Sequence, residues 1–324
     1  MRGTDPEKRL TQPWRRAGRV VGWCALLPAV VTLGARLTGF EAGPLAIAVA
    51  VTPWVLLSVA VPLVGAFFAR DRWLGAASGL VLVVGVATQV PLMTATPTQG
   101  EGVLTVASVN ATFGAVDGAA VTALVRDHGV DVLAVQEPTP AAVEALDRAG
   151  LGASLPYAEV APEEGFAGIG LWSALPLTEA GDVDGTTART LRAVVEVDST
   201  PVTLIAAHPA APGPWNHTLW AQDLAVLTEA AGAVHGPAIL VGDLNATRDH
   251  ASLRGLERGG FVDAADEAGA GWQFTFPEQR AGFPVAAIDH VMARELPWSA
   301  STLVTQALPG ADHRALVVEY SAPL

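Results

Sequence analysis

Polar side chains of the kinds that bind metals and move protons recur at the ends of short apolar segments in the later two-thirds of this chain. Asn110 ends the first such segment, Glu137 follows the second in Val-Gln-Glu-Pro, and His208 follows a third in Ala-Ala-His-Pro. The remaining members stand in Gly-Asp-Leu-Asn, Ile-Asp-His and Ala-Asp-His, and they are Asp243, Asn245, Asp289, Asp312 and His313. Carboxylate and amide oxygens suit a hard divalent cation, and imidazoles beside it suit proton transfer. We therefore expect a metal-assisted reaction where the fold gathers these residues.

Each of these features also has a non-catalytic interpretation. A single glutamate at a strand end is usually a solvated loop residue, and Asp-x-Asn is typical of a turn because both residues favour turn geometry. An Asp-His pair is often a helix cap or a surface pair. Six such features in series, each beside an apolar segment, favour a shared function instead. His290 adjoins Asp289 but would point the opposite way on a strand, so we interpret it as structural.

The segments that position these residues have the pattern of alternating strands and helices. From about Val103 onward, short β-branched runs alternate with Ala-rich stretches. Strands are expected over 104–109, 130–135, 194–197, 202–207, 238–241, 288–292 and 315–320, and helices over 119–128, 140–149 and 215–233. This mixture of hairpins and βα units predicts an α/β sandwich with mixed sheets. Ligands of layered α/β proteins collect at loops that follow strands, which is where the polar residues stand.

The first 96 residues differ from the rest of the chain in composition, because they consist largely of long apolar runs. Three apolar runs, at about 20–37, 44–69 and 73–93, each reach the roughly 20 residues that cross a bilayer. We expect a membrane domain of three transmembrane helices over 1–96 and a catalytic domain over 97–324. A buried helical hairpin is the soluble alternative, and a cleaved signal peptide is the alternative for the first run. Two further runs follow it, which favours a retained anchor.

Charge divides the chain at the same place and predicts its orientation. Residues 1–96 carry a net charge of +5, and residues 97–324 carry −18 with ten Arg and no Lys. Basic residues fill the leader before the first run, and Arg70 and Arg72 stand between the second and third. Because cytoplasmic loops are enriched in Lys and Arg, the amino terminus should be cytoplasmic and the catalytic domain extracytoplasmic. An acidic domain argues against long nucleic acids as preferred substrates. The single cysteine, Cys24, excludes a disulfide within one chain.

The order of the polar motifs resembles the endonuclease/exonuclease/phosphatase superfamily, which includes pancreatic deoxyribonuclease and neutral sphingomyelinase. The resemblance covers about residues 103–324, and Gly242-Asp243-Leu244-Asn245 and Asp312-His313 are its most specific parts. It implies a four-layer, deoxyribonuclease-I-like α/β sandwich, in which two packed mixed sheets are flanked by helices, here behind three transmembrane helices. It also implies a phosphoric ester hydrolase that uses Mg²⁺, with Mn²⁺ as the alternative.

The resemblance assigns roles residue by residue. Glu137 would be the principal metal ligand, with Asn110 beside it and Asp312 close to the metal. Asp243 would orient or deprotonate the attacking water. The residues that would contact the phosphate, or orient one that does, are Asn245, His208, His313 and Asp289. One position departs from the family pattern, because several members carry an acidic residue where this chain has Thr112. That departure puts tight binding of two metals in doubt.

The predicted layout narrows the substrate. A domain outside the cytoplasm, tethered near the bilayer by a linker of about ten residues and lacking Lys, suits a phosphorylated lipid or cell-envelope intermediate. The layout also resembles the membrane-bound VanJ-type proteins associated with teicoplanin resistance, which implies hydrolysis of a polyprenyl (pyro)phosphate or related ester. The expected partner is the lipid bilayer, and no obligate protein partner is evident. An extracytoplasmic nuclease and a non-catalytic binding module are the alternatives.

Overall fold

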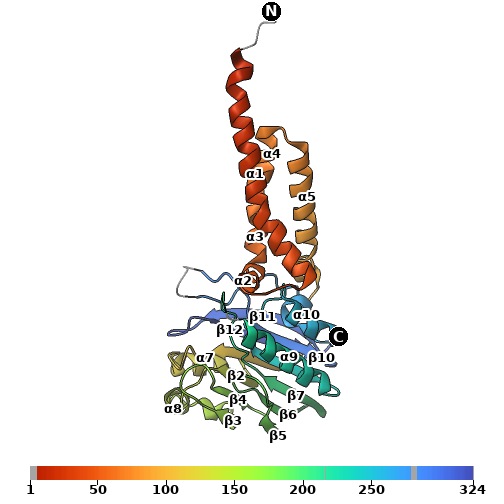
Figure 1. The fold of residues 1–324 in the computed structure, drawn as a ribbon. Coiled ribbons are helices and arrows are strands. Elements are labelled where there is room, and N and C mark those ends of the chain that lie inside the picture. Colours follow the sequence, from red (N-terminus) through yellow and green to blue (C-terminus); the bar gives the residue numbers. More distant parts are fainter. Residues whose placement is uncertain (1–5, 216, 279–282, 324) are drawn as a thin grey trace, which may run out of the picture. The chain divides into compact units, whose positions relative to one another are not determined.

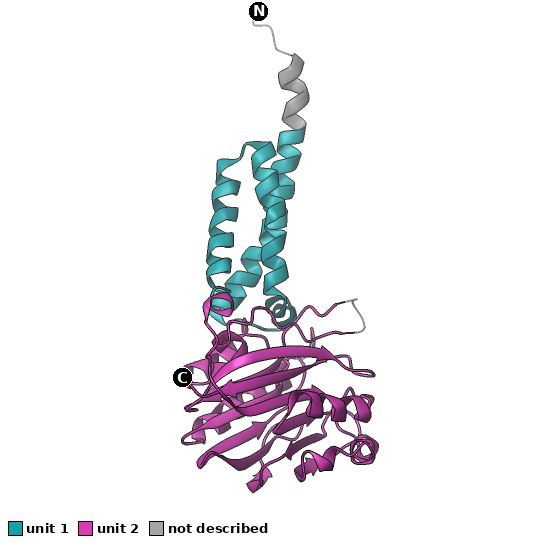
Figure 2. Ribbon diagram, turned by 180° about the vertical axis from the view of Figure 1, so that it is seen from behind, with its two compact units in different colours: residues 1–90 teal, residues 91–324 magenta. Residues whose placement is uncertain are grey.

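The computed structural model describes residues 6–215, 217–278 and 283–323. The chain divides into two compact units, Met1–Val90 and Pro91–Leu324 (Figure 2). We call the first the helical unit and the second the catalytic unit, and each is described by itself.

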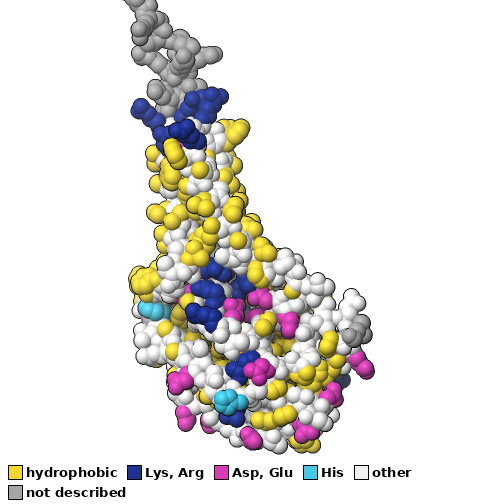
Figure 3. All heavy atoms as spheres, turned by 90° about the vertical axis from the view of Figure 1, so that its right-hand side faces the viewer, with side chains coloured by type: hydrophobic (Ala, Val, Ile, Leu, Met, Phe, Trp, Pro, Cys, Tyr) yellow, Lys and Arg dark blue, Asp and Glu magenta, His cyan; other side chains and the backbone are white. Residues whose placement is uncertain are grey.

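The helical unit consists of α-helices whose surfaces are largely apolar. They are α1 (Pro6–Thr38), α2 (Pro44–Ala50), α3 (Thr52–Ser58), α4 (Ala60–Ala69) and α5 (Arg72–Ala87). Figure 3 shows hydrophobic side chains over much of the visible surface of these helices. The most exposed include Leu27, Val61, Phe67 and Val83. Such side chains suit a lipid environment, because soluble proteins rarely expose contiguous apolar surface of this kind.

The structure supports two of the three predicted spans by length and composition. The stretches Trp14–Thr38 and Thr52–Ala69 are long and apolar enough to cross a membrane. The second predicted span, 44–69, is broken near Val51 and Val59, where α3 and α4 begin. The third, 73–93, is not one continuous helix: its main helix α5 has 16 residues and is about 24 Å long against roughly 30 Å of hydrocarbon. The prediction of three full-length spans is therefore reduced to two spans and a shorter apolar helix.

A polar contact joins the middle of α1 to the start of α5. Arg19 Nε lies 2.6 Å from Asp71 Oδ2, and Trp23 Nε1 donates to the same oxygen over 3.4 Å. Asp71 also caps α5, since its Oδ1 accepts from the backbone N–H groups of Trp73 and Leu74 over 3.1 and 3.2 Å. Arg19 therefore lies beside the loop between α4 and α5.

The catalytic unit is an α/β sandwich of two six-stranded mixed sheets, which confirms the predicted fold class at that level (Figure 1). The first sheet has the order β11-β12-β1-β2-β4-β3, and the second has the order β5-β6-β7-β8-β10-β9. The strands are β1 (Gly102–Asn110), β2 (Val132–Gln136), β3 (Tyr157–Ala161), β4 (Ile169–Ser173), β5 (Thr178–Asp182), β6 (Leu191–Val197), β7 (Thr200–Ala206), β8 (Ala238–Asp243), β9 (Val262–Asp263), β10 (Asp289–Arg294), β11 (Ser299–Ala307) and β12 (Arg314–Ser321). Each sheet has one parallel pair at its centre, β1 with β2 and β7 with β8.

Alternation along the central strands builds two hydrophobic cores. Leu104 and Val106 of β1 belong to the core between the sheets. Ala107 and Val109 of the same strand belong to a second core on the outer face of the first sheet. Successive side chains of a strand point to opposite faces, so a strand buried on both sides has a continuous apolar sequence.

Helices complete the layers. They are α6 (Pro91–Thr94), α7 (Gly118–His128), α8 (Pro140–Arg148), the short 3-10 helix η1 (Leu151–Ala153), α9 (Thr218–Ala233), α10 (Ala251–Arg258) and α11 (Ala264–Glu267). Val121 of α7 and Leu146 of α8 pack into the outer core of the first sheet. Beside the second sheet, Arg294 of β10 donates to Ala231 O of α9 over 3.2 Å. These contacts fix the central strands whose ends carry the polar motifs.

Candidate active site

The carboxyl ends of the four central parallel strands carry the motif residues to one place. Asn110 is the last residue of β1, and Glu137 follows β2 directly. Asp243 is the last residue of β8, and it pairs across the sheet with Asp289, the first residue of the antiparallel strand β10. The sheets pack face to face, and β1 contacts β8. Strand ends that are far apart in sequence therefore meet at a single edge of the sandwich.

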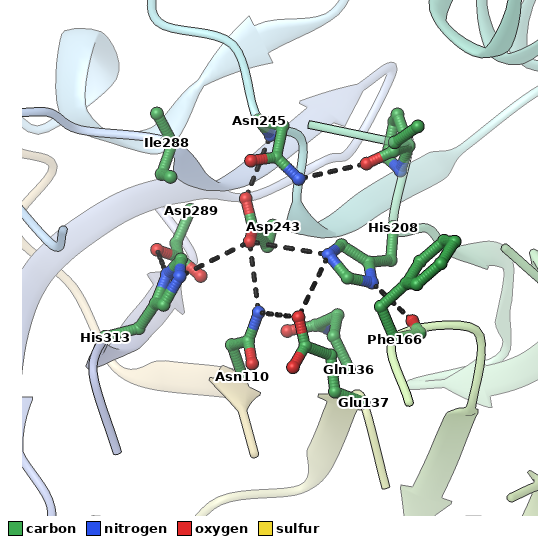
Figure 4. A network of polar contacts seen from close by, with 12 residues as sticks. Asn110, Gln136, Glu137, Phe166, His208, Asp243, Asn245, Ile288, Asp289 and His313 are labelled. Atoms are coloured by element: carbon green, nitrogen blue, oxygen red, sulfur yellow. Dashed lines mark hydrogen bonds and ion pairs between the residues drawn. The ribbon is translucent and has the colours of Figure 1, made fainter. Parts of the chain in front are cut away.

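Asp243 lies at the centre of this network (Figure 4). Its Oδ2 accepts from Asn110 Nδ2 over 3.1 Å and lies 3.6 Å from both His208 Nε2 and His313 Nε2. Its Oδ1 accepts from the backbone N–H of Asn245 over 2.9 Å. Burial alone would raise the pKa of Asp243, but the nearby charge of His313 and the hydrogen bond and charge of His208 lower it to about 2. Asp243 is therefore a carboxylate at neutral pH.

His313 and Asp289 form a buried dyad on one side of Asp243. His313 Nδ1 lies 2.8 Å from Asp289 Oδ2, so Asp289 orients the ring and leaves Nε2 facing Asp243. Burial opposes a charge on the imidazole, but the carboxylates of Asp289 and Asp243 raise the pKa of His313 to about 10. The ring is therefore a proton donor at neutral pH.

Glu137, Asn110 and His208 occupy the other side of Asp243. Asn110 Nδ2 donates to Glu137 Oε1 over 3.3 Å as well as to Asp243, so this amide bridges the two carboxylates. His208 Nε2 lies 3.7 Å from Glu137 Oε1, and its Nδ1 donates to Phe166 O over 3.1 Å. The structure thus gathers two acids and one imidazole within a few ångströms.

Burial and the neighbouring charges shift both of the remaining titratable groups. Burial raises the pKa of Glu137 above its ordinary value, against the lowering effect of His208. For His208, burial alone would lower the pKa, but the hydrogen bond to Asp243 and the charges of Asp243 and Glu137 raise it. Perturbed groups that cluster in a cavity are typical of functional sites.

The Gly-Asp-Leu-Asn turn is shaped by close backbone approach. Gly242 has φ +148°, and a Cβ on it would lie 2.0 Å from Ala207 O, so only glycine fits. The turn ends at Asn245, whose φ is +49° and whose Nδ2 donates to Pro209 O over 3.0 Å. The amide of Asn245 is therefore attached to the loop that carries His208.

Asp312 belongs to the same cavity and is held by Thr112. The Thr112 hydroxyl lies 2.7 Å from Asp312 Oδ1 and accepts from the Asp312 N–H over 2.9 Å. Sequence reasoning noted Thr112 only as a departure from the family pattern and did not foresee this pairing. His290 lies away from the site, since its ring contacts Asp263 over 2.5 Å and Ala246 O over 2.8 Å.

A cavity of about 440 Å³ opens onto these polar groups. Its volume lies in the range of small-molecule sites. The residues that line it are Phe113, Glu137, Phe166, His208, Ala210, Ala211, Asp243, Asn245, Phe276, Asp312 and His313. Sequence reasoning missed its three phenylalanines. They lie in loops, and a lone phenylalanine in a loop gives no signal that it faces a distant strand end.

The donors around Asp243 fit a divalent cation. Asp243, Asp289 and His313 offer ligand atoms within 4.8 Å of one another, and Asp289 Oδ1 is buried without a hydrogen-bond partner. A protonated His313 has no lone pair for a metal, however. Mg²⁺ prefers oxygen ligands, and Glu137 provides them on the other side of Asp243. Asp243 belongs both to the cluster with Asp289 and His313 and to the oxygen-donor pair with Glu137. Asn110 faces the carboxylates with its amide nitrogen, as a donor.

Comparison with known proteins adds independent findings. A model of the endonuclease/exonuclease/phosphatase family matches residues 107–313. The structure of D. rerio TDP2 with a single-strand DNA product is 17% identical, with a TM-score of 0.58 over 68% of this chain and 99% of that chain. An endonuclease/exonuclease/phosphatase family protein from Leptotrichia buccalis is 12% identical, with a TM-score of 0.53 over 67% and 99%.

Sphingomyelinase C from Streptomyces griseocarneus is also similar in structure. It is 17% identical, with a TM-score of 0.50 over 68% of this chain and 99% of that chain. At these identities the three likenesses show the fold alone. A search of curated protein sequences finds no significant match.

Proposed function

This chain belongs to the endonuclease/exonuclease/phosphatase family, and we propose that it hydrolyses a phosphoester or pyrophosphate of a lipid or cell-envelope intermediate outside the cytoplasm. The family and the buried Asp243, Asp289 and His313 make it a metal-dependent phosphoric ester hydrolase. The observation that carries the proposed chemistry is the placement of ionised Asp243 between the His208 and His313 imidazoles, each with its Nε2 3.6 Å from Asp243 Oδ2.

The side chains divide the work of an in-line displacement at phosphorus. Asp243 is too weak a base to hold a proton, so it accepts a hydrogen bond from the attacking water and orients it. His313 and His208 donate to phosphoryl oxygens and stabilise the charge that they carry in the transition state. The water oxygen bonds to phosphorus as the ester P–O bond breaks, and the proton that the water loses is, in net terms, the proton that the departing oxygen takes up.

Metal binding is assigned to the oxygen donors of this site. Glu137 and Asp243, with Asp312 in the same cavity, would hold the divalent cation. When bound, the cation supplies positive charge next to the phosphoryl oxygens. We propose Mg²⁺, because Glu137 and Asp312 add two carboxylates to that of Asp243 and because hard cations select oxygen.

The helical unit and the charge of the catalytic unit support the choice of substrate class. Two helices of suitable length and composition would keep the enzyme at a bilayer. Arg19 of the basic leader contacts Asp71 in the loop between α4 and α5, which is compatible with segments that share the cytoplasmic side. The resemblance to VanJ-type proteins leads to the same proposal, a polyprenyl (pyro)phosphate or related ester.

The test is a phosphate-release panel on the full chain in detergent or nanodiscs. It compares polyprenyl pyrophosphates, phospholipids, inositol phosphates and DNA, each with Mg²⁺ and with excess chelator. We expect release from the lipid substrates only when Mg²⁺ is present. Preferential cleavage of DNA would replace the proposal by an extracytoplasmic nuclease, and hydrolysis that persists in chelator would contradict the metal requirement.

The substitution that tests the assigned chemistry is Asp243→Asn. It preserves the volume of the side chain and removes the charge that orients water, so activity should fall by about 10³-fold. Asp182→Asn, at an exposed carboxylate of β5, is the control and should keep its activity. Thermal melting of both variants checks folding. Wild-type activity in a folded Asp243→Asn protein would show that the catalytic assignment is wrong.

A further inference from the structure

Two phenylalanines at the cavity are held in place by hydrogen bonds from their backbones to catalytic residues. The Phe113 N–H donates to Glu137 Oε2 over 2.7 Å, and Phe166 O accepts from His208 Nδ1 over 3.1 Å. Figure 4 shows the Phe166 ring beside His208. These backbone contacts place Phe113 beside Glu137 and Phe166 beside His208.

A third ring completes the arrangement. Phe276 packs on the His313 imidazole with ring centroids 4.7 Å apart. We call Phe113, Phe166 and Phe276 the phenylalanine collar, and all three line the cavity together with Ala210 and Ala211. The collar therefore puts apolar residues next to Glu137, His208 and His313.

The collar is left open to solvent. Phe113 is 58% exposed and Phe166 is 42% exposed, so both rings present apolar area that is not used in folding. Phe113 also has φ +53°, which is uncommon for a bulky residue and is sustained by its bond to Glu137. Exposed rings fixed at the mouth of a polar site are available to a ligand.

The charges around the cavity select among ligands. Of the described residues that line it, none is Lys or Arg, and residues 97–324 carry a net charge of −18. Binding of a polyanion depends on such cations, because each phosphate that is neutralised contributes to affinity. A ligand with one phosphate group and an apolar extension satisfies the lining better than one with many phosphates.

We propose that the phenylalanine collar is a subsite for the hydrocarbon chain of an amphiphilic phosphoester whose phosphate lies at Asp243. The proposal rests on the proposed function, since it takes the phosphate position from it, and it names the residues that would give lipid specificity. Three rings and two alanine methyl groups match a flexible chain, which needs apolar contact and no hydrogen bonds.

Binding of two inert phosphonates tests the collar without requiring turnover. Methylphosphonate and hexylphosphonate are titrated into the full chain in nanodiscs with Mg²⁺ by calorimetry, with empty nanodiscs subtracted. Each methylene of the hexyl chain that is buried contributes about fourfold in affinity. Burial of about two of them is enough for hexylphosphonate to bind about tenfold tighter than methylphosphonate, and we expect at least this difference. Equal affinities, or binding of neither phosphonate, would overturn the proposal.

Variants identify the rings as the cause. Phe113→Ala and Phe166→Ala should each shrink the ratio of the two dissociation constants by about threefold or more, through lost apolar contact. Tyr157→Ala removes an aromatic ring that is 43% exposed on β3 and does not line the cavity, so the ratio should not change. An unaltered ratio in both phenylalanine variants would contradict the assignment.

Leucine substitution separates a hydrocarbon from a stacked base. Phe113→Leu and Phe166→Leu keep the apolar area and should keep the ratio within about twofold. A nucleobase instead needs the flat ring, so a preference lost in both leucine variants would favour a nucleic acid and overturn the proposal. If the protein prefers hexylphosphonate but hydrolyses no phosphoester, the proposed function is wrong. The phenylalanine collar would then still be a binding site for a hydrocarbon chain.

Discussion

At the scale of single residues, the hydroxyl of Thr112 holds the Asp312 carboxylate in position. Thr112 stands where the family resemblance led us to expect an acidic residue, and its hydroxyl makes two contacts with Asp312. Its φ of +50° is a genuine outlier for a β-branched residue. Backbone strain of this kind persists where the surroundings enforce it, and here the enforcing contact is with a candidate metal ligand. Thr112 is therefore a positioning residue for Asp312.

Replacing Thr112 by valine should weaken metal binding. Valine keeps the shape but removes both contacts, so the Asp312 carboxylate loses its orientation. Loss of a group that orients a ligand typically costs about 10- to 100-fold in metal affinity. The measurement is the Mg²⁺ concentration that gives half of the maximal increase in melting temperature. Thr112→Ser retains the hydroxyl and should behave as wild type, and identical Mg²⁺ dependence in both variants would exclude the positioning role.

At the scale of elements, α9 secures both loops that carry catalytic groups on the second sheet. Trp220 Nε1 donates to Asn245 O over 3.0 Å. Asp223 is 2% exposed, and its Oδ2 accepts from the Ala210 N–H over 2.8 Å. Its other oxygen accepts from the N–H and the hydroxyl of Thr187, both over 2.9 Å. A single helix thus sets the Gly-Asp-Leu-Asn turn and the loop after His208 against each other.

Asp223→Ala should destabilise the catalytic unit by about 3 kcal/mol, because it leaves three donors without their acceptor. For a unit of this size the melting temperature should fall by about 6–12 °C. Phosphate release should also fall at temperatures where the variant is folded, because the loop after His208 loses its anchor. Gln222→Ala, on the exposed face of the same helix, is the control. A melting temperature within about 2 °C of wild type would contradict the role of α9.

Edge strands mark the limit of prediction from the sequence. Most internal strands are expected within a few residues, because burial on both faces gives them continuous apolar sequences. The expected strands omit the internal strand β4 and the four strands at the sheet edges, which are β3, β5, β9 and β11. All five residues of β5 are exposed, so no apolar period exists to be recognised. The motif residues came with the central strands, whereas the collar and the Thr112 contact depend on loops that meet only in the folded chain.

At the scale of the whole molecule, the side of the membrane on which the enzyme acts depends on α5. The charge pattern predicts a cytoplasmic amino terminus. Two crossings, by α1 and by Thr52–Ala69, would return the chain to the cytoplasm after Ala69. A third crossing, by α5 and the residues that follow it, would place the catalytic unit outside. Helix α5 has 16 residues, which is fewer than the usual minimum for a membrane span. The point to test is therefore whether the chain crosses the membrane two or three times.

Reporter fusions distinguish two membrane crossings from three. Alkaline phosphatase is active only after export, and green fluorescent protein fluoresces mainly in the cytoplasm, so each is fused after Gly43, after Arg70 and after Leu324. We expect phosphatase activity at Gly43 and Leu324 and fluorescence at Arg70, because α5 can reach across if the bilayer thins or the adjoining turn residues lie in the interface. Fluorescence at both Arg70 and Leu324 would show that α5 does not cross. The active site would then face the cytoplasm, and an extracytoplasmic envelope substrate would be excluded.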